Sequence, residues 1–173
     1  MPGMEDPNFM RGVTLLCQHN DEGALGITIN RESEYVLADV LEQLDLECTD
    51  QALAERPVYV GGPVHPERGF VLHTRDRRWE ATVEVGEGIC VTTSRDVLES
   101  VAAGDGPEKF LVALGYAGWE PGQLENEMRD NAWLSVMASA EIVFDLPVDQ
   151  RWEQAVARLG IDVATLQPAG GHA

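Results

Sequence analysis

The sequence has 173 residues, of which 44% are hydrophobic, and its 30 Asp and Glu against 12 Lys and Arg give a formal net charge of −18. The length fits one domain, and the hydrophobic fraction excludes an intrinsically disordered chain. The charge opposes the approach of nucleic-acid phosphates, so direct nucleic-acid binding is not expected. The densest basic segment, Arg75-Asp76-Arg77-Arg78, is short and contains an aspartate of its own.

No apolar run approaches the roughly 20 residues that a membrane-spanning helix needs. The first residues, Met1-Pro2-Gly3-Met4-Glu5-Asp6-Pro7, have neither the basic region nor the hydrophobic segment of a signal peptide. The 3 cysteines are an odd number without a closely spaced pair, which indicates free thiols in a reducing compartment. We therefore expect a cytoplasmic protein that does not bind membranes.

In chain order, residues 13–19 and 24–30 are predicted to form two strands joined by the turn Asn20-Asp21-Glu22-Gly23. A helix is expected over 37–44, because Leu37, Val40, Leu41 and Leu44 recur at helical spacing. Further short strands follow at 58–60, 70–73, 81–85 and 89–92.

The second half of the chain alternates helices with apolar runs. Helices are predicted over 94–104, 121–130 and 149–160, and the near-continuous apolar run at 110–114 predicts a central strand buried on both faces. The residues expected to begin these three helices are Ser94, Pro121 and Asp149. Two more short strands are expected at 133–136 and 142–144.

Strands and helices that do not alternate strictly favour an α+β fold over a doubly wound one. We predict a single domain over residues 1–166, with a mixed, curved sheet of about eight short strands and about four helices. Residues 167–173 are expected to form a flexible tail.

The turn Gly61-Gly62-Pro63-Val64 follows a predicted strand, which is also where a phosphate-binding loop can occur. Such a loop needs successive backbone N–H groups that point at the anion. Pro63 removes one donor, and Pro66 removes another. A tight turn between strands is therefore favoured, and a recognition loop on the same turn is the alternative.

The segment from Gly115 to Gln123 is predicted to join the buried strand to the next helix. Ligands often bind beyond the carboxyl ends of such strands. Tyr116 and Trp119 have flat apolar faces and one polar group each, which suit either a small ring or a partner's side chain. The alternative is that both aromatic rings cap the core.

On the predicted helix after Pro121, Glu127 shares the apolar face with Leu124 and Asn131. A carboxylate there needs a hydrogen-bond partner, which we expect to be a backbone N–H or Asn131. A structural role is favoured over a catalytic one. Glu125 and Arg129 are four residues apart and are predicted to form an exposed ion pair.

The internal histidines His19, His65 and His73 lack the spacing of a helical metal site. No Gly-x-Ser-x-Gly motif occurs, and Cys17 and Cys90 lie in apolar strands where a thiol acts as a small hydrophobic group. We therefore predict no catalytic residue, no metal and no cofactor. A non-enzymatic function is favoured.

Several segments resemble the YqgE/AlgH family of bacterial proteins, which are largely uncharacterised and are often named transcriptional regulators. The matching segments span about residues 4–160 in the same order. They are Met4, Asp6-Pro7-Asn8-Phe9, His19, Gly23-Ala24, Gly26, Asn30-Arg31, Gly61-Gly62-Pro63-Val64, Gly69-Phe70-Val71-Leu72-His73, Gly115-Tyr116-Ala117-Gly118-Trp119, Gly122-Gln123-Leu124-Glu125, Glu127, Asn131-Ala132-Trp133 and Phe144-Asp145.

The sequence departs from this family in two places. Glu32 stands where the family usually has proline after the Asn-Arg pair, which predicts a less rigid loop. Family members usually carry an apolar stretch before the Met-Pro segment, which leaves open a missing N-terminal strand or a misplaced start. The resemblance implies a compact α/β-type domain and a regulatory role, but no catalytic residue.

Two hypotheses follow. The first is a regulatory or interaction protein that contacts another protein or a small ligand through its Gly-rich loops. The second is a small-molecule-binding protein or unrecognised enzyme, with Glu127, Asn131, His19 and Asn30 converging in one pocket. The partner stays open, as does homo-oligomerisation. The candidate binding surface comprises His19, Asn30, Arg31, Gly61, Gly62, Pro63, Tyr116, Trp119, Gln123, Glu127 and Asn131.

Overall fold

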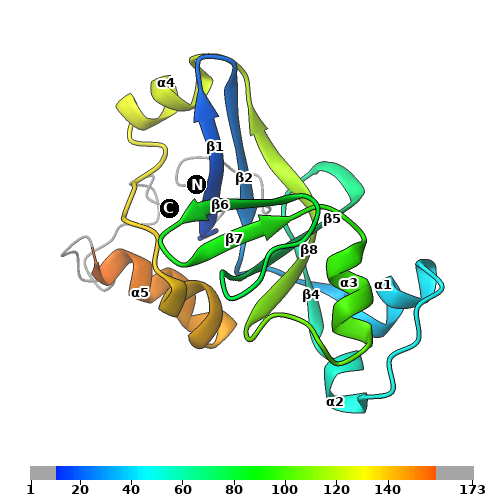
Figure 1. Ribbon diagram of the computed structural model, residues 1–173. Helices are drawn as coiled ribbons and strands as arrows, with labels where there is room; N and C mark the ends of the chain where they lie inside the picture. Colours follow the sequence, from blue (N-terminus) through cyan, green and yellow to red (C-terminus); the bar gives the residue numbers. More distant parts are fainter. Residues whose placement is uncertain (1–10, 159–173) are drawn as a thin grey trace.

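The computed structural model describes residues 11–158, which form one curved, nearly closed sheet of eight strands with helices around it (Figure 1). The strands are β1 (Thr14–Asn20), β2 (Gly23–Thr28), β3 (Glu32–Val36), β4 (Pro57–Val60), β5 (Val64–Thr74), β6 (Thr82–Gly86), β7 (Ile89–Thr92) and β8 (Phe110–Trp119). The helices are α1 (Leu37–Gln43), α2 (Gln51–Ala54), α3 (Asp96–Ala102), α4 (Gln123–Arg129) and α5 (Arg151–Ala157). The predicted α+β fold with a mixed, curved sheet is confirmed.

Strand β8 lies at the centre of the sheet, whose order is β1-β2-β8-β5-β7-β6. Its first half pairs antiparallel with β5 and parallel with β4, and its last residues pair with β2. Side chains of the first half alternate between two apolar clusters, with Leu111 in one and Val112 in the other. This confirms the predicted strand buried on both faces. The strand continues to Trp119, where the sequence predicted a connecting loop.

The strand β8 bends where it crosses the turn between β4 and β5. Gly115, at the bend, has a φ of 80°. The Gly61 N–H donates to the Leu114 carbonyl at 2.8 Å, and the Gly61 carbonyl accepts from the Thr28 N–H at 2.8 Å. A Cβ on Gly62 would lie 2.1 Å from the Tyr116 carbonyl carbon. The predicted tight turn is therefore present, and its glycines allow two backbones to touch.

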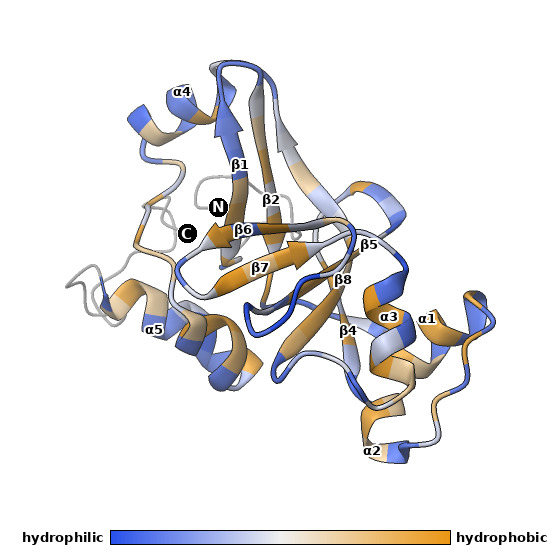
Figure 2. Cartoon of the chain, in the orientation of Figure 1, coloured by the Kyte–Doolittle hydropathy of each residue, from blue (hydrophilic) through white to orange (hydrophobic). Residues whose placement is uncertain are grey.

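The apolar core has two main parts, one on each face of the sheet. The strands and helices that contribute to it contain hydrophobic residues, coloured orange in Figure 2. The inner part lies inside the curve and includes Leu15, Ile27, Tyr59, Phe70, Leu72, Ile89, Leu111, Ile142 and Val143. The outer part lies between the sheet and the helices α1 and α3, and includes Leu37, Leu41, Val71, Val97, Leu98, Val101, Phe110 and Val112. Burying both faces of the sheet is the main source of stability, because each buried aliphatic side chain contributes about 1.5–3 kcal/mol.

One strand and one helix were not predicted from the sequence. The strand β3 is short, polar and mostly exposed, so its sequence shows no apolar alternation. The four-residue helix α2 is capped by Asp50, whose carboxylate accepts from the Leu53 N–H at 3.3 Å. Both elements are too short for a periodic signal.

The predicted helix starts were wrong by one or two residues. Helix α3 is preceded by Arg95, because the Ser94 hydroxyl instead donates to Asp96. Helix α4 begins after Gly122, not at Pro121, and Asp149 lies in a short 3₁₀ turn (Val148–Gln150) before α5. The predicted end of the last helix and the tail at 167–173 lie outside the described residues.

The strands predicted at 133–136 and 142–144 are absent from the described structure. Residues 133–139 form an irregular connection, and Glu141–Asp145 form a π-helical turn that buries Ile142 and Val143 in the inner core. Short apolar runs satisfy a strand and a buried turn equally well, so periodicity alone could not separate them. No helix within residues 11–158 is long and apolar enough to cross a membrane.

The substitution Gly115→Ala should destabilise the protein strongly. Its Cβ would lie 2.4 Å from the Gly62 carbonyl oxygen, in addition to the unfavourable positive φ. We expect a loss of about 3 kcal/mol or more in the free energy of unfolding. The matched control is Gly88→Ala, where φ is 76° and nothing lies within 4 Å of the added methyl group, and it should lose only about 1 kcal/mol. The free energy of unfolding of both variants is measured in urea. Equal losses in Gly115→Ala and Gly88→Ala would contradict the close backbone contact between Gly115 and Gly62.

Candidate functional site

The structure divides the predicted site residues into two groups. His19, Trp119, Gln123, Glu127 and Asn131 lie around the tip of the β1–β2 hairpin and helix α4. Gly61, Gly62, Pro63 and Tyr116 lie at the crossing of β8, and Asn30 and Arg31 lie close to it after β2, where the Arg31 carbonyl accepts from the Val60 N–H at 2.8 Å. The predicted residues therefore do not converge on one pocket.

Glu127 binds the indole groups of two tryptophans. Its Oε1 accepts from Trp119 Nε1 at 3.2 Å and from Trp133 Nε1 at 2.9 Å, and its Oε2 accepts from Gln123 Nε2 at 2.9 Å. The two indole rings meet edge to face with centroids 5.7 Å apart. The structural role predicted for Glu127 is thus present, with side chains as partners in place of a backbone N–H or Asn131.

The other polar residues of the first group are also engaged within the chain. His19 Nε2 lies 3.1 Å from Glu125 Oε1, whereas Arg129 donates to Asn126, so the predicted Glu125–Arg129 pair is not formed. Asn131 follows α4 with a φ of 59°, which places it at the turn that ends the helix. The contact between His19 and Glu125 links α4 to the hairpin.

In the second group, Asn30 and Tyr116 also have structural contacts. Asn30 Oδ1 accepts from the Val13 N–H at 2.8 Å, and its Nδ2 donates to the Arg11 carbonyl at 2.9 Å. The Tyr116 ring packs edge to face on Phe70 with centroids 5.8 Å apart. The interpretation of Tyr116 and Trp119 as rings that cap the core therefore agrees with their contacts.

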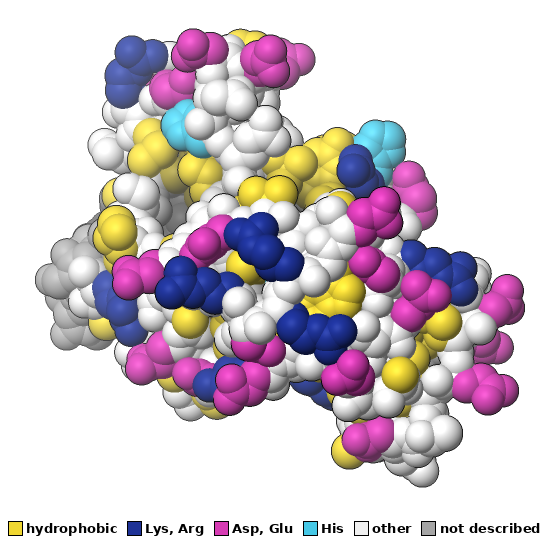
Figure 3. Space-filling model, in the orientation of Figure 1, with side chains coloured by type: hydrophobic (Ala, Val, Ile, Leu, Met, Phe, Trp, Pro, Cys, Tyr) yellow, Lys and Arg dark blue, Asp and Glu magenta, His cyan; other side chains and the backbone are white. Residues whose placement is uncertain are grey.

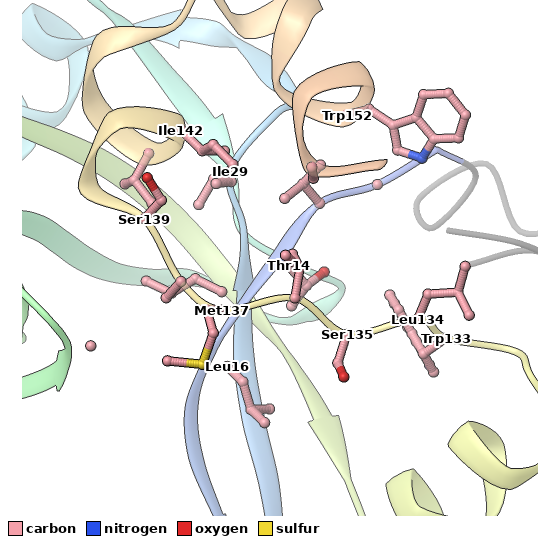
Figure 4. Close-up of a pocket in the computed structure, with 18 of the residues that line it drawn as sticks. Thr14, Leu16, Ile29, Trp133, Leu134, Ser135, Met137, Ser139, Ile142 and Trp152 are labelled. Atoms are coloured by element: carbon pink, nitrogen blue, oxygen red, sulfur yellow. The ribbon is translucent and has the colours of Figure 1, made fainter. Parts of the chain in front are cut away.

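One large groove on the molecule, here called the seam groove, has a volume of about 420 Å³ (Figure 4). It runs between the edge strands β1 and β6, which approach each other where the sheet nearly closes, and residues 133–139 form its outer wall. Its lining is mostly apolar and includes the exposed side chains of Leu16 (37%), Val136 (38%) and Met137 (84%). Trp119 is the one predicted site residue in it.

A second groove, here called the helix groove, has a volume of about 620 Å³ and lies between α1 and the turn that leads into α3. Its floor is the outer face of the sheet, with Val71, Val112 and Leu114, joined by Leu98 from α3. Its walls and rim are formed by Tyr35, Asp39, Val40, Glu42, Gln43, Leu44, Pro66, Glu67, Thr93, Ser94 and Arg95. An apolar floor with polar groups at the rim is typical of binding sites.

The helix groove is the stronger candidate of the two. The lining of the helix groove brings four charged side chains next to its apolar floor, namely Asp39, Glu42, Glu67 and Arg95. Among the described residues that line the seam groove, Glu87 is the one charged side chain. No sequence pattern predicted this groove, because Tyr35 lies on the unpredicted strand β3 and the walls meet only through the β3–β4 and β4–β8 pairings.

A chain of hydrogen bonds in the sheet reaches the floor of the helix groove at Thr92. His73 is fully buried, and its Nδ1–H must donate to the Thr74 carbonyl, at 2.6 Å. Its Nε2 therefore accepts from the Thr92 hydroxyl at 2.6 Å, and Thr92 accepts in turn from Thr82 at 2.6 Å. Burial lowers the pKa of His73 below its usual 6.5, so the ring is neutral.

The thiols of Cys17 and Cys90 do not have the surroundings of nucleophiles. Burial raises the pKa of Cys17 to about 12, and burial is also the main cause that raises the pKa of Cys90. A thiol nucleophile needs the opposite shift. Within the described part of the chain, no group of three or more His, Cys, Asp and Glu side chains is arranged to hold a metal ion.

The fold defines the structural class of this protein, which is a single α+β domain built on a nearly closed, mixed sheet. The solution structure of the AlgH protein from Pseudomonas aeruginosa has this fold, with a TM-score of 0.81 and 50% sequence identity over 95% of this chain and 87% of that one. A crystal structure of protein DIP2367 from Corynebacterium diphtheriae shares the fold alone, with a TM-score of 0.71 and 19% identity over 91% of this chain and 86% of that one.

The chain belongs to the AlgH-like family (DUF179), whose family model matches residues 1–164. A UPF0301 protein of Xanthomonas campestris pv. campestris (strain B100) is 50% identical over all of this chain and 92% of its own length. A UPF0301 protein of Thioalkalivibrio sulfidiphilus is 53% identical over the same shares. The resemblance found in the sequence is thereby confirmed. The family has no defined molecular activity.

The substitution Glu127→Ala should destabilise the protein by about 3 kcal/mol, because it leaves two indole N–H groups without their charged acceptor. The matched control on the same helix is Glu125→Ala, which removes an exposed contact to His19 and should give no measurable change. The free energy of unfolding, followed by tryptophan fluorescence, measures both. A loss for Glu127→Ala no larger than that for the control would contradict the assigned role.

The free energy of unfolding should decrease as the pH falls, and His73 should cause part of this decrease. The folded state lowers the pKa of His73, so it binds the proton less readily than the unfolded state does. The contribution is present above the unfolded pKa of about 6.5 and is lost as the pH falls through the folded-state pKa. The slope should reach at most about 1.4 kcal/mol per pH unit.

The measurement compares the free energy of unfolding between pH 7.5 and pH 5 for the wild-type chain, His73→Gln and the exposed control His19→Gln. The pH dependence should be shallower in His73→Gln than in the other two. An unchanged slope in His73→Gln would show that other groups cause the acid destabilisation.

Proposed function

We propose that this protein is a non-enzymatic regulatory or interaction protein that binds a segment of another protein in the helix groove. One observation carries the proposal: a groove of about 620 Å³ with an apolar floor and a polar rim lies open between two helices. The polar residues that could have formed a catalytic pocket, Glu127, His19 and Asn30, are engaged in contacts that hold the fold.

Action through a protein, not by direct DNA binding, is supported by the surface charges (Figure 3). The basic side chains lie among acidic ones on the visible face. In the arginine run, Arg75 pairs with Glu84 at 3.2 Å and Arg77 pairs with Asp105 at 3.0 Å. Arginines that are already paired attract phosphates less, and the chain carries a net charge of −18. We place this function in the cytoplasm, which the three free thiols support.

A protein segment fits the groove better than a small metabolite does. Tyr35 is 48% exposed at the rim, and an exposed tyrosine beside an apolar floor is typical of protein interfaces. The second hypothesis, a metabolite pocket formed by the Gly-rich loops and polar residues, has weaker support. Those loops pack against each other at the crossing of β8.

The test starts with a peptide selected on the full chain from a displayed random library. The variant Tyr35→Ala should bind this peptide about tenfold more weakly, because tyrosine is among the residue types enriched at the hot spots of protein interfaces. The matched control is Val83→Ala, an apolar side chain that is 60% exposed on β6 and outside the groove, and it should bind like the wild type. Equal binding by Tyr35→Ala, or a peptide that loses affinity only in the control, would contradict the proposal.

A further inference from the structure

The charged side chains that line the helix groove are mostly acidic. Asp39 and Glu42 lie on α1, and Glu67 lies on β5. All three are exposed. The one cationic side chain in the lining is Arg95.

The positive charge of Arg95 is already engaged at one wall. Its Nη2 donates to the Leu44 carbonyl, just past the end of α1, at 2.5 Å, and its Nε lies 3.9 Å from Glu99 on α3. This arginine therefore links the two helices that form the walls. It is not held by the carboxylates of Asp39, Glu42 or Glu67 in any described ion pair.

The three carboxylates have few partners within the described chain, so they can accept a cation from another molecule. Asp39 accepts from the Val36 N–H at 2.8 Å, which is a neutral donor, and Glu67 lies 3.3 Å from the exposed His65 ring. Glu42 has no hydrogen bond or ion pair with any residue from 11 to 158 that involves its carboxylate. A cation that entered the groove would meet negative charge on α1 and on β5.

The apolar floor determines what a ligand of the groove needs in addition to a cation. Val40 on α1, Leu44 just past its end and Leu98 on α3 line the groove together with the acidic residues. Lysine and arginine side chains have apolar stems that pack on such surfaces while the charged group stays near water. The exposed ring of Tyr35 adds a face over which a cation can lie.

We infer that the helix groove binds a segment of a partner protein that carries arginine or lysine next to an apolar side chain. The cation meets Glu42 and Asp39 at the α1 wall, and the apolar side chain packs on the floor. This inference rests on the proposed function and specifies its partner. Complementary charge also fits the net charge of −18, which speeds the encounter with a basic partner.

The test uses three matched peptides with the same leucine positions, whose remaining variable positions are all arginine, all glutamine or all glutamate. Binding to the full chain is measured by fluorescence anisotropy at physiological salt. The arginine peptide should bind at least about tenfold more tightly than the glutamine peptide, and the glutamate peptide should bind most weakly.

Charge-reversal variants distinguish binding in the groove from attraction by the net charge of the whole protein. Glu42→Lys should weaken binding of the arginine peptide about tenfold. Glu47→Lys makes the same change in net charge at an exposed residue outside the groove and should change binding by less than about twofold. Equal weakening in both variants would show attraction by bulk charge only and would overturn the inference.

The outcomes also distinguish the inference from the proposed function. If the glutamine peptide binds as tightly as the arginine peptide and Tyr35→Ala weakens both, the groove binds a partner but the inferred cation is wrong. If Tyr35→Ala weakens none of the peptides, the groove itself is not the site and both fail.

Discussion

The contact on which the rest of the structure depends is the backbone crossing between Gly62 and Gly115. At this point β8 leaves its partners β4 and β5 and continues towards β2. A side chain at either glycine would force the two backbones apart, because its Cβ would lie within 2.5 Å of backbone atoms of the other segment. One strand can therefore belong to both halves of the sheet, and the sheet can curve until β1 and β6 approach each other.

The curvature decides which surfaces remain for binding. The inner face is filled by the core, and α4 is fixed over the hairpin by the Glu127 carboxylate and the two indoles. On the outer face, α1 and α3 cover the sheet but stand apart, so part of the apolar floor between them stays open. The resulting groove combines apolar surface with carboxylates, which suits recognition of another molecule more than chemical reaction.

The sequence was sufficient for elements whose signal is local. The apolar run at 110–114 predicted the central strand, and the spacing of Leu37 and Leu41 predicted α1. The continuation of β8 through Gly115 was missed, since a glycine-rich segment suggests a loop unless its long-range partners are known. The helix groove was missed for the same reason: its walls come together through the pairings of β3, β4 and β8, and no local pattern marks Tyr35 or Glu42.

Amide chemical-shift mapping of the uniformly labelled full chain, titrated with an arginine–leucine peptide, tests the central claim most directly. Recognition in the helix groove predicts that the largest shifts fall on residues 39–44, 66–71 and 92–98, which contribute most of its lining. Shifts concentrated on residues 133–139 of the seam groove, or on α4, would contradict it.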